Sequence, residues 1–363
     1  MTARSKRYSK RLIGLVIVIA LLLVFAELGL RFYVDRFGTQ DQKIYYIYDA
    51  EAVALATGRF QPQPYTNFGL SPNYNDHNSR GYRGDEFVVP KPDGVYRIVA
   101  LGDSTVYGNG ITDWRLTYPA QLQTLLREQG YSNVEVINAS VGGYASYDIL
   151  AQFIYRILDL EPDMVIVYQA TNDVSLRLVP PEYFTSENVV RGVWSHNYAP
   201  LPTSALYRFV GIRLKWIPVP GVEDTWHVEP TEPVSLCLNN CEISGDELIA
   251  TNDTRYFERN MRSLIVLAQT NNVAVMLSTW AYYPEATMAN YMTQAYRVRG
   301  ITETNDVIRR LAEEYETLFY DFQKEIPLER NYWQEGVHLT EQGTAEQARQ
   351  YATYLIGSGS LAK

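Results

Sequence analysis

The longest apolar stretch of the chain runs from Leu12 to Leu30, 19 residues in which Glu27 is the single charge. An α-helix of that length spans about 28 Å, close to the roughly 30 Å hydrocarbon core of a bilayer. Arg31 and Arg36 follow the run, and five basic residues precede it, so charges flank both of its ends. The pattern predicts a transmembrane helix near the N-terminus.

A cleaved signal peptide shares the basic start and the apolar run. An uncleaved anchor is favoured because the run exceeds a usual signal core and no clear Ala-x-Ala site follows it. Basic residues before the run outnumber those just after it, which predicts a cytoplasmic N-terminus. The remainder of the chain would then lie outside the cytoplasm, in a single-pass membrane protein.

Beyond residue 95, short apolar runs alternate with segments of helical spacing. Residues Met164–Gln169 (MVIVYQ) are apolar on both faces, which is typical of a central strand in a parallel sheet. The alternation predicts an α/β fold, a three-layer sandwich with a central parallel sheet and right-handed crossovers. The predicted strands are Tyr96–Leu101, Val134–Asn138, Met164–Gln169, Val273–Ser278 and Leu318–Asp321, and the predicted helices are Tyr118–Glu128, Tyr147–Leu160, Arg255–Gln269, Ile301–Tyr315 and Glu341–Ile356.

The patterns predict three parts of the chain. Residues 1–36 form a basic tip and the anchor, residues 37–94 a polar stalk or N-terminal wrap, and residues 95–363 the α/β domain. Between about 175 and 253 the alternation breaks, and an aperiodic stretch of that length in a compact domain is usually a functional insertion. Within it, residues 204–221 fit either an amphipathic patch on the membrane surface or a loop that packs its aromatic rings over the sheet.

Charge and composition narrow the classes of function. The formal net charge is −9, but the first eleven residues carry five basic and no acidic residues, which leaves −14 (27 basic, 41 acidic) for the rest. An acidic body argues against a nucleic-acid partner. Four histidines without His-x-x-x-His spacing and two cysteines argue against a metal site, and no cofactor is expected. Cys237 and Cys241 fit either a small local disulfide loop or a free pair.

Candidate chemistry lies where the predicted strands end, which is where ligands bind in open α/β sheets. Ser104 follows the first strand, Gly143 lies in the loop after the second, and Asn172 follows the third. His338 precedes the last helix, with Glu335 three residues before it. A serine needs a base to become a nucleophile, which His338 could supply while Glu335 fixes its tautomer.

The N–H of Gly143 and the side-chain amide of Asn172 could donate hydrogen bonds to a developing oxyanion. Each residue alone also has a structural explanation. A serine at a strand-to-helix junction is often an N-cap, asparagine is common in turns, and a lone Glu-x-x-His is a weak signal. The four places together favour catalysis over chance.

These blocks resemble the SGNH/GDSL hydrolase superfamily. Residues 102–104 (GDS) are similar to its first block, Gly143 to its second-block glycine, Asn172 to its third-block asparagine, and His338 in GVHLT to its last block. The resemblance covers about residues 78–174 and 255–356 and implies the flavodoxin-like SGNH-hydrolase fold. The segments NSRGYRGDE and ELGLR also resemble membrane-anchored bacterial members.

Two positions depart from the family pattern. Glu335 stands where the last block usually has aspartate, and Ala170 stands where the third block usually begins with glycine. Glutamate serves in related triads on other folds, and the small side chain of Ala170 is compatible with the same backbone path.

The resemblance implies acyl transfer by Ser104, with His338 as general base and Glu335 as its support. The oxyanion would be held by the N–H groups of Ser104 and Gly143 and by Asn172, while Asp103 would orient the turn. The expected function is an extracytoplasmic, membrane-anchored serine ester hydrolase that acts on O-acylated glycans or lipids. Two alternatives stay open: an O-acyltransferase with the same triad, and a non-catalytic envelope protein on a hydrolase fold.

Overall fold

The computed structural model describes residues 3–38, 42–43, 46–47, 59–186, 204–214, 216–217, 243–284 and 294–361. By its internal contacts the chain forms two compact units. The smaller unit comprises residues 1–58 and 192–229, and the larger unit comprises residues 59–191 and 230–363. Cys237 and Cys241 lie outside the described residues.

The smaller unit contains α1 (Ala3–Phe37) and α8 (Ala205–Arg213). Within α1, residues Arg11–Phe37 are long and apolar enough to cross a membrane. Their most apolar 18-residue stretch has a mean hydropathy of 2.8, and none of that stretch is buried. The helix extends beyond the predicted span because no proline or glycine interrupts residues 31–37 before Gly38.

The larger unit is built on five parallel strands in the order β4-β3-β5-β6-β7. With the strands ranked along the chain this is the order 2-1-3-4-5 of flavodoxin-like sheets. All five residues of β5 are buried, and β5 pairs with β3 and β6, so it is the central strand that its apolar sequence predicts. The bounds are β3 (Tyr96–Gly102), β4 (Val134–Asn138), β5 (Met164–Tyr168), β6 (Ala274–Ser278) and β7 (Leu318–Tyr320).

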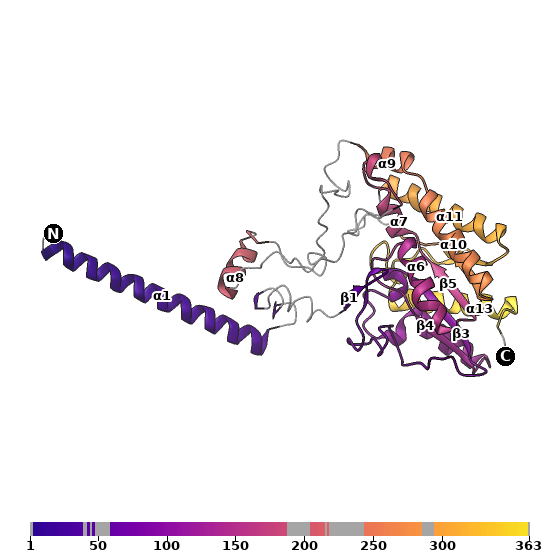
Figure 1. Cartoon of the computed structure of the whole chain (residues 1–363), viewed down its shortest axis with the longest axis horizontal. Helices are drawn as coiled ribbons and strands as arrows, with labels where there is room; N and C mark the ends of the chain where they lie inside the picture. The colour runs from indigo at the N-terminus through magenta and orange to yellow at the C-terminus, as the bar shows by residue number, and fades with distance from the viewer. Residues whose placement is uncertain are drawn as a thin grey trace. The chain divides into compact units, whose positions relative to one another are not determined.

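Helices cover both faces of this sheet, which makes the predicted three-layer sandwich (Figure 1). One layer contains α5 (Tyr118–Glu128) and α13 (Glu341–Ser358), which pack against each other. The other layer contains α6 (Ser146–Gln152), α10 (Arg255–Thr270) and α11 (Ala295–Glu314). This division follows from right-handed crossovers, which place the first and last helices of this strand order on the same face.

The helix predicted over residues 147–160 changes its winding along its length. After α6 the chain forms a π turn (Phe153–Ile157) and then a 3-10 turn (Leu158–Leu160). Ile149, Phe153 and Ile157 are all fully buried. Their spacing of four residues exceeds the 3.6 of an α-helix, so a wider turn keeps the three side chains on one face.

Several short elements carry no periodicity in the sequence and were not predicted. Residues 59–94, within the predicted stalk or wrap, contain an antiparallel hairpin that belongs to the larger unit. The predicted insertion contains two short helices, α8 and α9 (Gly245–Thr251), and other short helices follow the strands. These elements are β1 (Phe60–Gln63), β2 (Asn67–Leu70), α4 (Ser104–Tyr107), α7 (Thr171–Leu176), α9 (Gly245–Thr251) and α12 (Phe322–Glu325).

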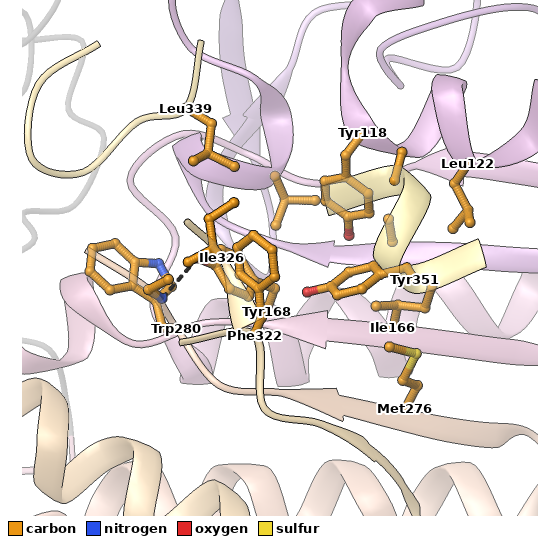
Figure 2. Close-up of a cluster of buried hydrophobic side chains, with 14 of the residues drawn as sticks. Tyr118, Leu122, Ile166, Tyr168, Met276, Trp280, Phe322, Ile326, Leu339 and Tyr351 are labelled. Carbon is orange, nitrogen blue, oxygen red and sulfur yellow. Dashed lines mark hydrogen bonds between the residues drawn. The ribbon is translucent and has the colours of Figure 1, made fainter. Parts of the chain in front are cut away.

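An aromatic core joins the sheet to α5 and α13. Figure 2 shows Tyr118, Leu122 and Tyr351 gathered over the strand residues Ile166 and Met276. The rings of Tyr118 and Tyr351 meet edge to face at 5.4 Å, a favoured geometry for aromatic pairs. Because α13 follows the loop that carries His338, this core fixes the end of that loop against the sheet.

Candidate active site

The strand-to-helix turn that carries Ser104 is tightly packed. A Cβ atom on Gly102 would lie 2.4 Å from Val106 Cγ2 and 2.5 Å from the carbonyl oxygen of Tyr168, so only glycine fits there. The buried Asp103 is the N-cap of α4, and its carboxylate accepts hydrogen bonds from the Thr105 N–H at 2.8 Å and hydroxyl at 2.7 Å. Burial raises the pKa of Asp103. This geometry places Ser104 at the first position of α4, at the carboxyl end of β3.

Three of the predicted residues form one hydrogen-bonded chain. His338 Nε2 lies 2.9 Å from Ser104 Oγ, and His338 Nδ1 is hydrogen-bonded to Glu335 Oε1. Serine and histidine come from positions 234 residues apart in the sequence. A hydroxyl, an imidazole and a carboxylate in this order can move a proton away from the serine and stabilise the charged ring that results.

Glu335 is held by the backbone as well as by the imidazole. Its carboxylate accepts hydrogen bonds from the His338 N–H at 3.1 Å and from the Val337 N–H at 3.4 Å. Burial acts to raise the pKa of Glu335, but the hydrogen bond and charge of His338 and these two N–H groups outweigh it and lower the pKa. The loop therefore folds back on the longer side chain and presents it to the ring.

The loop after β4 lies beside the serine. A Cβ atom on Gly142 would be 3.7 Å from the Ser104 Cβ, and Gly143 has a left-handed φ of 84° that favours glycine. Asn172, in α7, donates a hydrogen bond from Nδ2 to the carbonyl oxygen of Tyr144 at 2.8 Å. One N–H of that amide is thereby fixed on the glycine loop, and the second N–H is available to another acceptor.

The same edge of the sheet is braced by Asp173. Its buried carboxylate accepts hydrogen bonds from the N–H and hydroxyl of Ser146 and from Gln169 Nε2 at 2.9 Å. Burial raises the pKa of Asp173 to about 6. The side chain of Asp173 thus ties the end of β5 to the start of α6.

Arg83 supports the C-terminal end of α4, the short helix that begins with Ser104. The sequence patterns did not identify this residue. Its guanidinium donates to the carbonyl oxygens of Tyr107, Gly108 and Ile111 at 2.9, 2.9 and 2.6 Å, and it pairs with Asp76 at 2.6 Å. These carbonyls lie at the end of α4 and just beyond it, where helix carbonyls have no intrahelical partners. The resemblance of the segment NSRGYRGDE to anchored family members was the available signal.

Two further residues reach the site from outside the predicted set. Gln334 Nε2 donates to the carbonyl oxygens of Asn109 at 2.8 Å and Leu339 at 2.6 Å, so it joins the histidine loop to the loop after α4. Arg59 has its Nη2 3.7 Å from the position that a Cβ on Gly142 would occupy. Neither residue lies in a local pattern that could have identified it.

A comparison with known protein families identifies the family of this chain. The sequence profile of the GDSL-like Lipase/Acylhydrolase family matches residues 100–345. No curated protein matches the chain.

Solved structures with a similar fold include three from the lipases and esterases. A GDSL-like lipase from Bacteroides thetaiotaomicron is 16% identical with a TM-score of 0.39, and the match covers 73% of this chain and 89% of that one. An acetyl xylan esterase from Geobacillus stearothermophilus is 15% identical with a TM-score of 0.43, covering 72% and 94%. The acetyl xylan esterase AlAXEase is 17% identical with a TM-score of 0.43, covering 71% and 98%.

Proposed function

We propose that this chain, which belongs to the GDSL-like lipase/acylhydrolase family, is a membrane-anchored serine ester hydrolase that acts outside the cytoplasm. Membership of the family gives ester hydrolysis as the class of reaction. The observation that carries the serine mechanism is the hydrogen-bonded chain from Ser104 Oγ through His338 to Glu335.

In the proposed reaction Ser104 Oγ attacks the carbonyl carbon of an ester while His338 Nε2 accepts the hydroxyl proton. Glu335 stays ionised, as its lowered pKa favours, and stabilises the imidazolium. The tetrahedral intermediate collapses when His338 returns the proton to the leaving alcohol. Water then attacks the acyl-serine by the same route and releases the acid.

The proposed oxyanion site consists of the N–H groups of Ser104 and Gly143 and the second N–H of Asn172. Its support is the hydrogen bond between Asn172 and Tyr144, which joins α7 to the loop of Gly143. Donors fixed before the reaction cost no reorganisation when charge develops, and removal of one such donor typically costs about 10²–10³ in rate.

The proposed location rests on the helix Arg11–Phe37 and the basic residues before it. Both favour a single pass with the N-terminus in the cytoplasm. An enzyme held there meets O-acylated surface glycans and lipid esters, which we propose as its substrate class.

The test is a hydrolysis screen of the full chain in detergent against acetyl, butyryl and longer esters and against acetylated glycans. Wild-type protein should release acid and take up a fluorophosphonate, while Ser104→Ala should do neither. Exposed Ser79→Ala is the matched control and should behave as wild type. No labelling of folded wild-type protein would favour the non-catalytic alternative, and acyl transfer to an added sugar in place of acid release would favour the acyltransferase.

A further inference from the structure

Glu27 of α1 makes polar contacts that an apolar membrane helix does not need for itself. Its carboxylate accepts hydrogen bonds from Ser204 Oγ at 2.9 Å and from the N–H groups of Ala205 at 2.8 Å and Leu206 at 2.7 Å. It also pairs with Arg31 at 2.7 Å. Ser204 is the N-cap of α8, so the carboxylate of one helix completes the N-terminus of the other.

The position of Glu27 along α1 sets the depth of this contact. Glu27 follows Arg11 by 16 residues, which is about 24 Å of helix. Arg31 lies about 30 Å along the helix from Arg11. With Arg11 at one surface of a hydrocarbon core of about 30 Å, Glu27 lies just inside the opposite surface. A carboxylate there is costly unless it is paired and hydrogen-bonded, which the start of α8 and Arg31 achieve together.

The outer side of α8 is apolar and exposed. Tyr207, Val210 and Leu214 share one face by their spacing of three and four residues, and all three are exposed. Trp216, just beyond the helix, is 68% exposed. The opposite side of α8 is covered: Ala205 and Arg208 are buried, and the ring of Phe209 packs on Tyr46 at 5.3 Å.

We propose that α8 and Trp216 form a second membrane contact, embedded in the outer interface and docked on α1 through Glu27. Lipid covers the exposed face of α8. The reason is that the contact between Glu27 and the start of α8 lies within the depth of the hydrocarbon core. Tyrosine and tryptophan suit this level of a bilayer, where one end of the side chain is apolar and the other is wet. The inference rests on the proposed membrane anchor and adds that the anchor is kept, since cleavage near residue 28 would remove the partner of α8.

The test uses full-length protein in vesicles of phosphatidylethanolamine and phosphatidylglycerol, with and without brominated acyl chains. The emission of Trp216 is obtained as the difference between wild type and Trp216→Phe. We expect brominated lipid to remove most of that difference. The matched control is Trp114, in the larger unit, whose emission from the Trp114→Phe difference should be unchanged.

The docking contact is tested by repeating the Trp216 measurement in Glu27→Ala, in Glu27→Gln and in Leu28→Ala, the last a neighbouring exposed position on α1. Quenching should be lost in Glu27→Ala, partly kept in Glu27→Gln, which retains one acceptor oxygen, and intact in Leu28→Ala. Fluorophosphonate labelling of each variant reports whether the larger unit is folded.

Each other outcome overturns a distinct statement. Unquenched Trp216 in wild-type protein that resists carbonate extraction would refute the second contact and leave the anchor standing. Equal quenching in wild type and Glu27→Ala would refute the docking through Glu27. A soluble mature protein that starts near residue 28 would refute the anchor and this inference together.

Discussion

At the scale of single residues, Glu335 decides whether the proposed site works as a triad. Glu335→Gln should keep the fold and lower ester hydrolysis by about 10²–10³, less than the roughly 10⁴ of the comparable change in a serine protease. The amide removes the charge that supports the imidazolium and presents a donor where the ring needs an acceptor. Steady-state kinetics on a short ester, with circular dichroism to verify folding, measure the effect.

A double variant tests whether the residues act as one unit. In a His338→Ala background, Glu335→Gln should lower the rate of ester hydrolysis little further. Glu335 acts by orienting the imidazole of His338, and that ring is already absent. Hydrolysis by Glu335→Gln at the wild-type rate, with Ser104→Ala and His338→Ala both inactive, would instead indicate a Ser–His dyad.

Asp173 predicts a pH dependence of stability. Its folded pKa of about 6 lies above the usual value of aspartate, about 3.9, so the folded state keeps a proton that the unfolded state has lost. The contribution of Asp173 to stability is therefore largest below pH 4 and falls as the pH rises through 6, by up to about 3 kcal/mol. Asp173→Asn removes this titration.

The measurement is the difference in unfolding free energy between wild type and Asp173→Asn from urea denaturation at pH 4 and pH 7. The wild-type advantage should shrink as the pH rises. If the difference in unfolding free energy were the same at pH 4 and pH 7, that result would contradict the raised pKa of Asp173, however large the difference was.

At the scale of elements, the segment before β3 should support the serine turn through Arg83. Arg83→Lys keeps one charge but loses the planar fork that reaches three carbonyls, and it should cost about 3 kcal/mol of unfolding free energy. The matched control is the exposed Arg80→Lys, which should cost less than about 0.5 kcal/mol. Chemical denaturation of both variants, together with kcat on a short ester, measures the effect. Equal stability of the two variants would show that the contacts of the Arg83 guanidinium are dispensable.

Elements marked by a local hydrophobic pattern were predictable, and those fixed by distant partners were not. The strand at Val134–Asn138 and the helix at Tyr118–Glu128 agree with the structure to the residue, because turn residues bound their patterns. The strands of the hairpin β1–β2 have four residues each, too few to establish a period, and β1 contains a proline at position 62. The positions of Ser104 and His338 were predictable from family blocks, whereas Gln334 acts across 225 residues, a separation that no local pattern encodes.

At the scale of the whole molecule, the N-terminal helix should keep the protein in the membrane. The full chain is expected in the pellet after washes with high salt and with alkaline carbonate, because Arg11–Phe37 is apolar and of membrane-spanning length. Immunoblotting of pellet and supernatant, with N-terminal sequencing of the product, measures this. Release into the supernatant with an intact N-terminus would mean that the helix does not span the bilayer.

The separation of 234 residues between nucleophile and base also orders events during biosynthesis. A chain made and exported from its N-terminus presents Ser104 long before the loop that carries His338 exists. Until that loop arrives the serine has no base, so under the proposed topology the growing chain would cross the membrane without hydrolytic activity. Nascent chains arrested between residues 176 and 330 should accordingly fail to react with a fluorophosphonate. Reactivity of Ser104 should appear only in chains long enough to contain the folded loop that carries His338.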